Sequence, residues 1–121
     1  MAERNIQSAI REALGLEPDL VLWRNNTGVF ADGRGGMVRT GLGVGSADLV
    51  GILRGAAQMH IAARFVGRFF ALEVKQARGR ASEEQQRWLA LVRSFGGFAS
   101  VVRSVQEAKA ALDRARKGES K

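Results

Sequence analysis

The chain has 121 residues and a mass of 13.1 kDa, which is the size of one domain. Hydrophobic residues make up 45% and charged residues 26%, so the composition excludes an intrinsically disordered chain. Nineteen basic residues against twelve acidic ones give a formal net charge of +7 and a pI near 11.2. This surplus favours a polyanionic partner such as nucleic acid, although some small proteins are basic without one.

The sequence contains no cysteine, which excludes disulfides, thiolate zinc sites and cysteine nucleophiles. The single histidine, His60, cannot form a two-histidine metal site, and we expect it to be a partly exposed strand residue. No signal-peptide pattern and no run of 18 apolar residues is present, so we expect a cytoplasmic protein without a membrane segment. Any metal site must use oxygen ligands, which points to Mg²⁺, Mn²⁺ or Ca²⁺.

The first half of the chain predicts a helix over residues 3–15 and a short buried strand over 20–23. Residues 28–45 then form a glycine-rich segment that reads as a long loop or a loose hairpin and contains Arg34 and Arg39. This segment matches no phosphate-binding glycine motif. It is either a flexible surface loop or a backbone that approaches a ligand, such as a DNA strand, closely.

The second half predicts three strands, over 47–53, 59–66 and 69–75, the last two joined by a tight Gly67-Arg68 turn. A helix then opens at Ser82 with a capping box to Gln85, and its apolar face is predicted to contain Trp88, Leu91, Val92 and Phe95. A last strand is expected over 98–103, followed by a helix to about Arg116 and a frayed tail over 117–121. The order α-β-β-β-β-α-β-α indicates a single α/β domain over residues 1–116, with a mixed β-sheet flanked by helices.

Two carboxylates stand in strands where solvated acids are not expected. Asp48 and Glu73 both lie within apolar runs, and a lone buried carboxylate is costly unless it is paired or binds a metal. Strand alternation places Lys75 on the same face as Glu73, with the Val74 carbonyl at the edge of the site. Two oxygen ligands beside a lysine suit metal-dependent phosphodiester hydrolysis. The alternative is an ordinary salt bridge between Glu73 and Lys75 on an edge strand.

These residues resemble the core of the PD-(D/E)xK nucleases, with Ala47 in place of the usual proline before Asp48. More specifically, the chain resembles a stand-alone VRR-NUC domain over about residues 3–112. Four motifs carry the similarity, in chain order. Glu3–Gln7 matches the E-x-x-I-Q start of a helix, and Asn26–Gly28 matches an N-x-G motif after the first strand. Lys75–Arg80 matches K-x-x-x-G-R, and Ser82–Leu89 matches s-x-x-Q-x-x-W-L in a helix.

The resemblance implies a restriction-endonuclease-like fold and a Mg²⁺- or Mn²⁺-dependent endonuclease that acts on branched or flapped DNA. It implies that Asp48 and Glu73 are metal ligands and that Lys75 is the catalytic lysine. The resemblance also implies that Gln85 is an active-site residue and that Glu3 is a further metal ligand. Both residue types are also common in the first turn of a helix, where Gln completes a capping box and Glu interacts with the helix dipole. Viral and bacterial members of this kind resemble homodimers that cut four-way junctions, which places the protein in a bacterial or phage-infected cytoplasm.

Four arginines are candidate phosphate contacts beside this site: Arg34, Arg39, Arg78 and Arg80. The apolar side chains of Phe65, Phe69 and Phe70 are candidates for a dimer interface. The main hypothesis is a metal-dependent, structure-specific DNA endonuclease. The alternatives are a non-catalytic basic DNA-binding module and a small scaffold protein whose charge only aids solubility.

Overall fold

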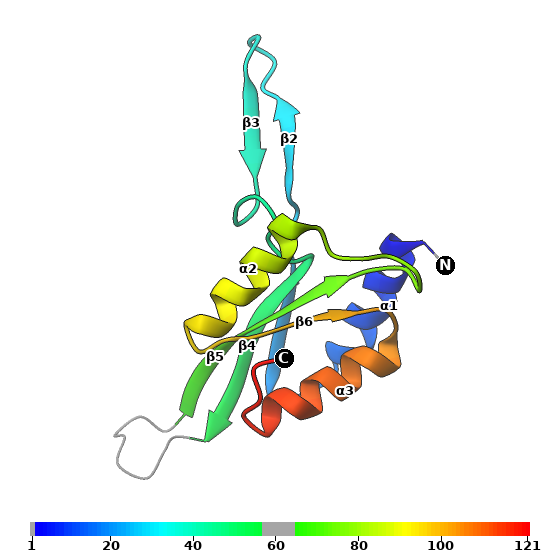
Figure 1. Cartoon of the computed structure of the whole chain (residues 1–121), viewed down its shortest axis with the longest axis vertical. Helices are drawn as coiled ribbons and strands as arrows, with labels where there is room; N and C mark the ends of the chain where they lie inside the picture. The colour runs from blue at the N-terminus through cyan, green and yellow to red at the C-terminus, as the bar shows by residue number, and fades with distance from the viewer. Residues whose placement is uncertain (1, 57–64) are drawn as a thin grey trace.

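The computed structural model describes residues 2–56 and 65–121. Figure 1 shows the nine helices and strands of this described part in chain order. They are α1 (Glu3–Leu14), β1 (Leu20–Arg24), β2 (Gly28–Ala31), β3 (Met37–Thr40), β4 (Leu49–Ala56), β5 (Phe65–Val74), α2 (Glu83–Ser94), β6 (Phe98–Val102) and α3 (Val105–Arg116). Within the described ranges, no helix has the length and apolar character needed to cross a bilayer.

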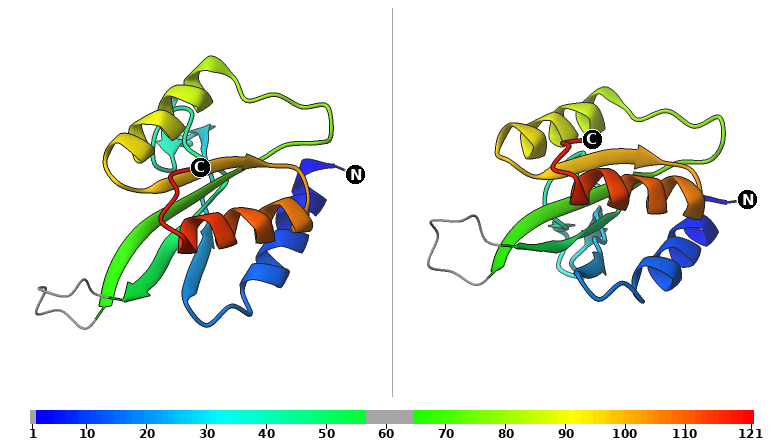
Figure 2. Two further views of the ribbon diagram at one scale, coloured as in Figure 1. Left: turned by 60° about the horizontal axis from the view of Figure 1, so that its bottom comes forward. Right: turned by 90° about the horizontal axis from the view of Figure 1, so that it is seen from below.

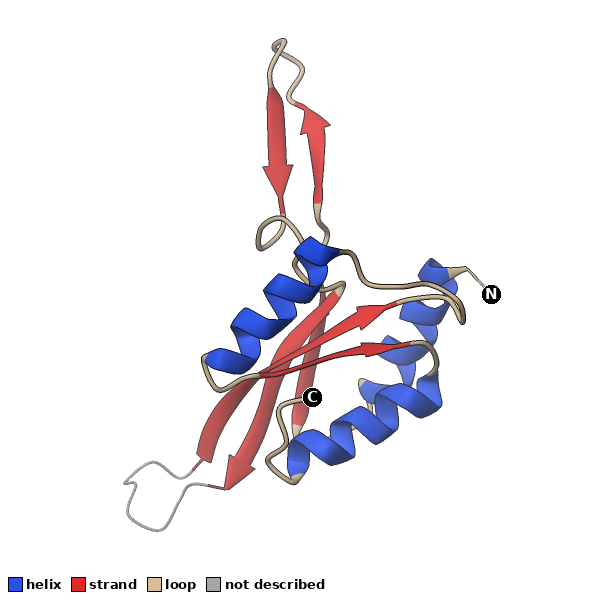
Figure 3. Ribbon diagram, viewed as in Figure 1, coloured by secondary structure: helices blue, strands red, loops and turns tan. Residues whose placement is uncertain are grey.

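The main sheet has the strand order β1-β4-β5-β6. Strand β5 pairs with β6 in parallel, while the other two pairs are antiparallel, so the sheet is mixed. Helices α1 and α3 cover one face of this sheet and α2 lies on the other (Figures 2 and 3). The predicted α/β fold with a mixed sheet between helices is therefore confirmed.

The larger core lies between the sheet and the pair α1 and α3. Helix α1 contributes Ile6, Ile10 and Leu14, which recur every four residues and therefore share one buried face. Phe70 of β5 and Phe98 of β6 stack with their ring centroids 5.2 Å apart, across the parallel strand pair. This packing fixes β5, and therefore the acidic residue near its end, relative to both helices.

A smaller core lies under α2, and its composition differs from the predicted apolar face. Leu89 is the buried residue of α2, and it packs on the small side chains of Ala47, Ala71 and Ala99. Trp88 and Val92 are half-buried against this cluster. Leu91 and Phe95, which were predicted to face the core, are exposed. Compared with the predicted orientation, α2 is rotated about its axis so that Leu89 faces the sheet. The three alanines leave room for one leucine side chain and not for the larger predicted set.

The glycine-rich segment contains a two-stranded hairpin, formed by β2 and β3, that projects away from the main sheet (Figure 1). Its turn is closed by Asp32, whose Oδ1 accepts hydrogen bonds from the backbone N–H groups of Arg34 and Gly36. Gly33 and Gly35 adopt the positive φ angles that this turn requires. Of the two possibilities left open by the sequence, the hairpin is the one observed.

The predicted turn at Gly67-Arg68 is wrong, because β5 continues through both residues and pairs them with Arg54 and Leu53. Arg68 has a structural reason to lie within the strand. Its guanidinium donates hydrogen bonds to the carbonyls of Gly96, Gly97, Ala115 and Glu119, three of them at 2.9–3.1 Å and the Gly97 bond at 3.5 Å. The predicted strand over 59–66 lies mostly outside the described residues, as does His60.

The C-terminal tail follows a defined path, which differs from the frayed end predicted for residues 117–121. The backbone N–H of Ala99 donates to the Ser120 carbonyl at 3.0 Å, and the carbonyl of Glu119 accepts from Arg68 at 2.9 Å. Arg114 donates to the carbonyl of Lys121 at 3.1 Å. These hydrogen bonds hold the tail beside the start of β6.

Candidate active site

Glu73 lies near the end of β5 with a side chain that is 1% exposed. Neither of its carboxylate oxygens has a hydrogen-bond partner within the described part of the chain. The pKa of Glu73 is raised to about 9, mainly by burial and next by the neighbouring Asp48, while the Lys75 ammonium opposes the shift. A buried and unpaired carboxylate costs free energy, so its presence indicates a group that completes its coordination in another state of the protein.

Asp48 lies immediately before β4, one residue from the start of the pairing between Leu49 and Leu72. Its Oδ2 accepts a hydrogen bond from the backbone N–H of Val74 at 2.8 Å. This bond connects the start of β4 to the end of β5 and holds the Asp48 carboxylate beside Glu73. The two inward carboxylates predicted from the sequence are thus brought together by adjacent antiparallel strands.

Asn25, directly after β1, holds the backbone around Asp48. Its side-chain Nδ2 donates to Ser46 Oγ at 2.9 Å and to the Ala47 carbonyl at 2.8 Å, and its backbone N–H donates to the Asp48 carbonyl at 2.7 Å. Its Oδ1 accepts from the backbone N–H of Leu42 at 3.3 Å. The role of Asn25 is not visible in the sequence, because an asparagine after a short strand is an ordinary turn signal and its partners are about 20 residues away.

Lys75 and Glu3 complete the set of charges around Glu73. Lys75 is half-buried, lies on the same face of the chain as Glu73 and is fixed by its backbone N–H, which donates to the Val102 carbonyl at 3.0 Å. Glu3, in the first turn of α1, lies close enough for its charge to raise the pKa of Glu73. Its place as a metal ligand stays a prediction.

Gln85 lies in the first turn of α2 and takes part in the predicted capping box. Its Oε1 accepts a hydrogen bond from the Ser82 N–H at 2.9 Å, while its own N–H donates to Ser82 Oγ at 3.1 Å. The loop before Asp48 packs against this helix end at Gly45, which has φ of +80°, and a β-carbon there would lie 2.5 Å from the Glu84 carbonyl oxygen. The local role of Gln85 is therefore observed, and an active-site role stays a prediction.

The donor atoms gathered here fit a hard divalent cation. Asp48 and Glu73 supply carboxylate oxygens, and the backbone of Val74 lies between them. Mg²⁺ is typically held by one or two carboxylates and keeps several waters, so a two-carboxylate site is sufficient. No cluster of three or more acidic or histidine side chains suited to a metal occurs in residues 2–56 and 65–121.

The four candidate phosphate-binding arginines divide into two pairs. Arg34 and Arg39 lie on the projecting hairpin, in its turn and on β3, and both are exposed. Arg78 and Arg80 lie in the loop between Lys75 and α2, and both are also exposed. Arg78 and Arg80 follow Lys75 directly in the chain, and the hairpin is joined to Asp48 through the loop of residues 41–47.

The mixed sheet, the paired carboxylates and the following lysine define a domain of the PD-(D/E)xK nuclease type. The VRR-NUC domain family matches this chain over residues 35–106, a range that contains Asp48, Glu73, Lys75 and Gln85. The chain belongs to the VRR-NUC family, and a nuclease-type role in DNA processing follows from this membership. A search of curated proteins gave no match.

Proposed function

We propose that this protein is a Mg²⁺- or Mn²⁺-dependent endonuclease that hydrolyses phosphodiester bonds in branched DNA, such as four-way junctions or flaps. The observation that carries the proposal is the buried Glu73 carboxylate, which lacks a hydrogen-bond partner among the described residues and lies beside Asp48. A cation supplies what this arrangement lacks, because it compensates two adjacent negative charges that burial otherwise opposes.

In this mechanism Asp48 and Glu73 hold the cation, with the Val74 carbonyl as a third oxygen and Glu3 as a further candidate. The bound ion would polarise the scissile phosphodiester and make a water molecule more nucleophilic. The Val74 N–H keeps the Asp48 carboxylate in place through its 2.8 Å hydrogen bond. The two ligands therefore come from a preorganised strand pair, which lowers the cost of assembling the site.

Lys75 is the proposed catalytic lysine. Its ammonium lies on the Glu73 face, where it can orient or deprotonate the attacking water or neutralise charge that develops on the phosphate. Gln85, at the start of α2, is proposed to contact the attacking water or the phosphate with the part of its amide that the capping box leaves free. The exposed arginines on the hairpin and on the loop after Lys75 would hold the DNA backbone.

Cleavage of a labelled four-way junction in the presence of Mn²⁺ tests this function. We expect Asp48→Asn, Glu73→Gln and Lys75→Ala each to reduce the rate by on the order of 100-fold or more. Glu83→Gln, which removes an exposed acid from the first turn of α2, is the matched control and should cleave like the unmodified protein. Equal cleavage by all four variants would contradict the proposed site, and salt-dependent binding without cleavage would favour the non-catalytic module.

We also propose that the protein works as a homodimer, because two copies related by a twofold axis can cut opposing strands of a junction. Support comes from an uncovered part of the sheet. Val21, Ile52 and Phe69 are opposite one another on β1, β4 and β5, and all three are exposed where α2 does not cover the sheet. We call this surface, together with Trp23, Leu91 and Phe95, the open apolar face.

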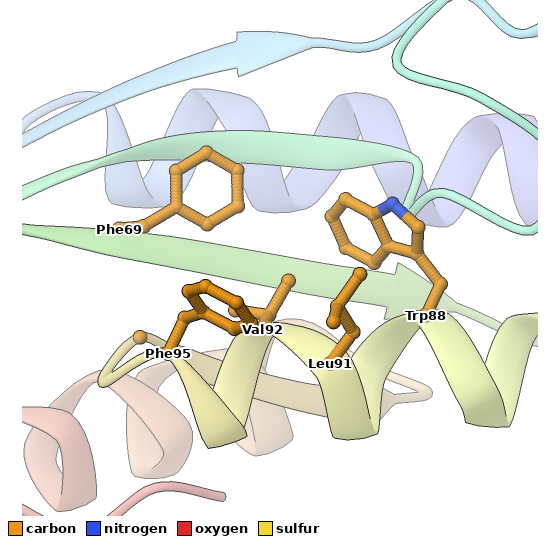
Figure 4. A pocket seen from close by; sticks show the side chains of 6 residues that line it. Phe69, Trp88, Leu91, Val92 and Phe95 are labelled. Atoms are coloured by element: carbon orange, nitrogen blue, oxygen red, sulfur yellow. The ribbon is translucent and has the colours of Figure 1, made fainter.

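Figure 4 shows how the open apolar face continues onto α2. The ring of Phe69 and the side chains of Leu91 and Phe95 border an apolar pocket, with Trp88 at its other end. The pocket has a volume of about 320 Å³, and Phe69 meets Trp88 edge to face at 6.2 Å between ring centroids. Of the three phenylalanines predicted for an interface, Phe65 and Phe69 are exposed, whereas Phe70 is fully buried in the core. Exposed apolar surface of this kind is typical of protein interfaces.

A further inference from the structure

A second cavity, of about 520 Å³, lies on the other side of α2 from the open apolar face. It is formed by the loop before α2, the side of α2 and the strand β6, and Leu89 and Val101 supply its apolar wall. Three arginines line it, Arg80, Arg93 and Arg103, and none of its lining residues is acidic. A cavity with three cations and no carboxylate in its wall has the charge pattern of an anion site.

Arg93 and Arg103, the two half-buried arginines of this cavity, are held in place by backbone carbonyls. Arg93 Nε donates to the Ala99 carbonyl at 2.9 Å, and Arg103 Nη2 donates to the Gly79 carbonyl at 2.9 Å. Each bond uses one of the five N–H groups of a guanidinium, so most of the donors stay available to a ligand. The two side chains are thus positioned in advance, which reduces the entropy that binding must cost.

These three guanidinium groups have no ion-pair partner in the described part of the chain. The Glu107 carboxylate accepts a hydrogen bond from the backbone N–H of Arg103 at 3.2 Å and forms no ion pair with its guanidinium. Burial lowers the pKa of Arg93, which shows that its charge is partly desolvated without a neighbouring anion to compensate. A structural role of Arg93 and Arg103 explains their carbonyl bonds but not the absence of acids among the residues that line the cavity.

The cavity also lies next to the proposed catalytic site. Val101, in its wall, is the β6 partner of Glu73 on β5, and neighbouring strands are about 4.8 Å apart. The loop that starts at Lys75 runs to the cavity through Gly79 and Arg80, and Arg103 fixes it at Gly79. A nucleic-acid strand at Glu73 can therefore reach this cavity with a phosphate near the scissile one.

We propose that the Arg80–Arg93–Arg103 cavity binds a phosphate group of the DNA strand that occupies the candidate active site. The proposal rests on the proposed function and adds a substrate subsite to it. The bidentate fork of arginine matches the oxygens of a phosphate, whether that phosphate is an internal diester or the end of a strand. The two sources share this chemistry and differ in charge, which allows an experiment to separate them.

The test measures binding of the full chain to a fluorescent single-stranded oligonucleotide in EDTA, over a series of salt concentrations. We expect the double variant Arg80→Gln with Arg93→Gln to raise Kd about tenfold. The slope of log K against log salt should decrease by about 1.4, since each phosphate contact on single-stranded DNA contributes about 0.7. Arg87→Gln removes an exposed charge from α2 outside the cavity and is the control.

A 5′-phosphorylated and a 5′-hydroxyl form of the oligonucleotide distinguish the sources. If the double variant loses more affinity for the phosphorylated form, the cavity binds the terminal phosphate of a strand. If it loses the same affinity for both forms, the cavity binds an internal phosphodiester. A double variant that binds within twofold of Arg87→Gln overturns the proposal. If Arg93→Gln lowers the melting temperature, the single variant Arg80→Gln replaces the double variant in this test. It should reduce the slope of log K against log salt by about 0.7. Because no metal is present, the result does not depend on whether the protein cleaves DNA.

Discussion

At the scale of single residues, the main feature is the state of Glu73 before any ligand arrives. Its carboxyl group is buried, has a pKa of about 9 and lies beside a second carboxylate at Asp48. Near neutral pH the folded protein therefore keeps a proton on Glu73 that the unfolded chain has released. Folding is then opposed by an amount that grows with pH between the two pKa values.

This difference predicts the effect of Glu73→Gln on the metal-free protein. Below the unfolded pKa of 4.5 the wild-type carboxyl is protonated in both states, and the two proteins should be about equally stable. As pH rises toward about 9 the wild type alone loses stability. Each pH unit between the two pKa values corresponds to about 1.4 kcal/mol, so at pH 8 the variant should be more stable by up to about 5 kcal/mol. Urea denaturation in EDTA at pH 5 and pH 8 measures the difference.

Added Mn²⁺ provides the complementary control for this prediction. It should raise the melting temperature of the wild type, because a cation bound only to the folded state stabilises it, and should raise that of Glu73→Gln much less. A variant that is less stable than the wild type at pH 8 in EDTA would show that Glu73 makes a favourable structural contact, and would argue against its role as a ligand.

The sequence identified Asp48 and Glu73 because a lone acid within an apolar run is visible without a structure. It did not identify Asn25, Arg93 or Arg103, since their partners, apart from the Ser46 hydroxyl of Asn25, are backbone carbonyls or backbone N–H groups that only the fold brings near. Backbone groups carry no sequence signal, so a side chain that binds them cannot be distinguished from a solvated one.

At the scale of elements, the loop between β3 and β4 determines where Asp48 lies. Asn25 binds this loop at Leu42, Ser46 and Ala47, and Gly45 packs against the first turn of α2. The loop therefore joins the end of β1, the start of β4 and α2 at one place. Its rigidity is a condition for the position of the Asp48 carboxylate.

We predict that Asn25→Ala weakens both stability and metal binding. Three side-chain hydrogen bonds are lost, which corresponds to about 1–3 kcal/mol in the free energy of unfolding. Mn²⁺ affinity, measured by calorimetry, should also fall, because the backbone that carries Asp48 is no longer held.

Asn26→Ala is the matched control, since the adjacent Asn26 side chain is exposed and its contact with Thr40 is made by the backbone carbonyl. It should leave both quantities within error of the wild type. Equal Mn²⁺ affinity of Asn25→Ala and the wild type would show that Asp48 does not depend on this loop for its position.

The helices were predicted closely because their ends carry local signals. Ser82 and Gln85 cap α2 as the sequence indicated, and at the start of α3 the Ser104 hydroxyl accepts a hydrogen bond from the Glu107 N–H. The strands were predicted less well. Gly67-Arg68 has the composition of a turn, but Arg68 bonds to four carbonyls from distant segments, and these tertiary contacts override the local preference.

At the scale of the whole molecule, α2 is too narrow to cover its face of the four-stranded sheet. The part over β1 and β4 stays open, and it joins the exposed end of α2 at Phe95, which is 86% exposed. Under the homodimer proposal, the open apolar face of one copy packs against that of the other.

Phe95→Glu should therefore shift the protein from dimer to monomer and raise the dimer dissociation constant at least tenfold, because a charge would be buried at the interface. Size-exclusion chromatography with light scattering measures the mass. Leu16→Glu is a suitable control, since Leu16 is 85% exposed just after α1, as Phe95 is just after α2, but lies outside the open apolar face. A monomeric wild type, or a dimer that Phe95→Glu leaves intact, would contradict this interface.

The antiparallel register of β4 and β5 has a consequence for changes in chain length. Leu49 opposes Leu72, and this pairing sets Asp48 beside Glu73. Deleting one residue within β4 would put the side chains before and after the deletion out of register, so that either Asp48 or the rest of β4 would turn to the opposite face. The hairpin turn at Gly33–Gly35 carries no such register toward the main sheet. Insertions there should therefore leave the fold of the main sheet unchanged.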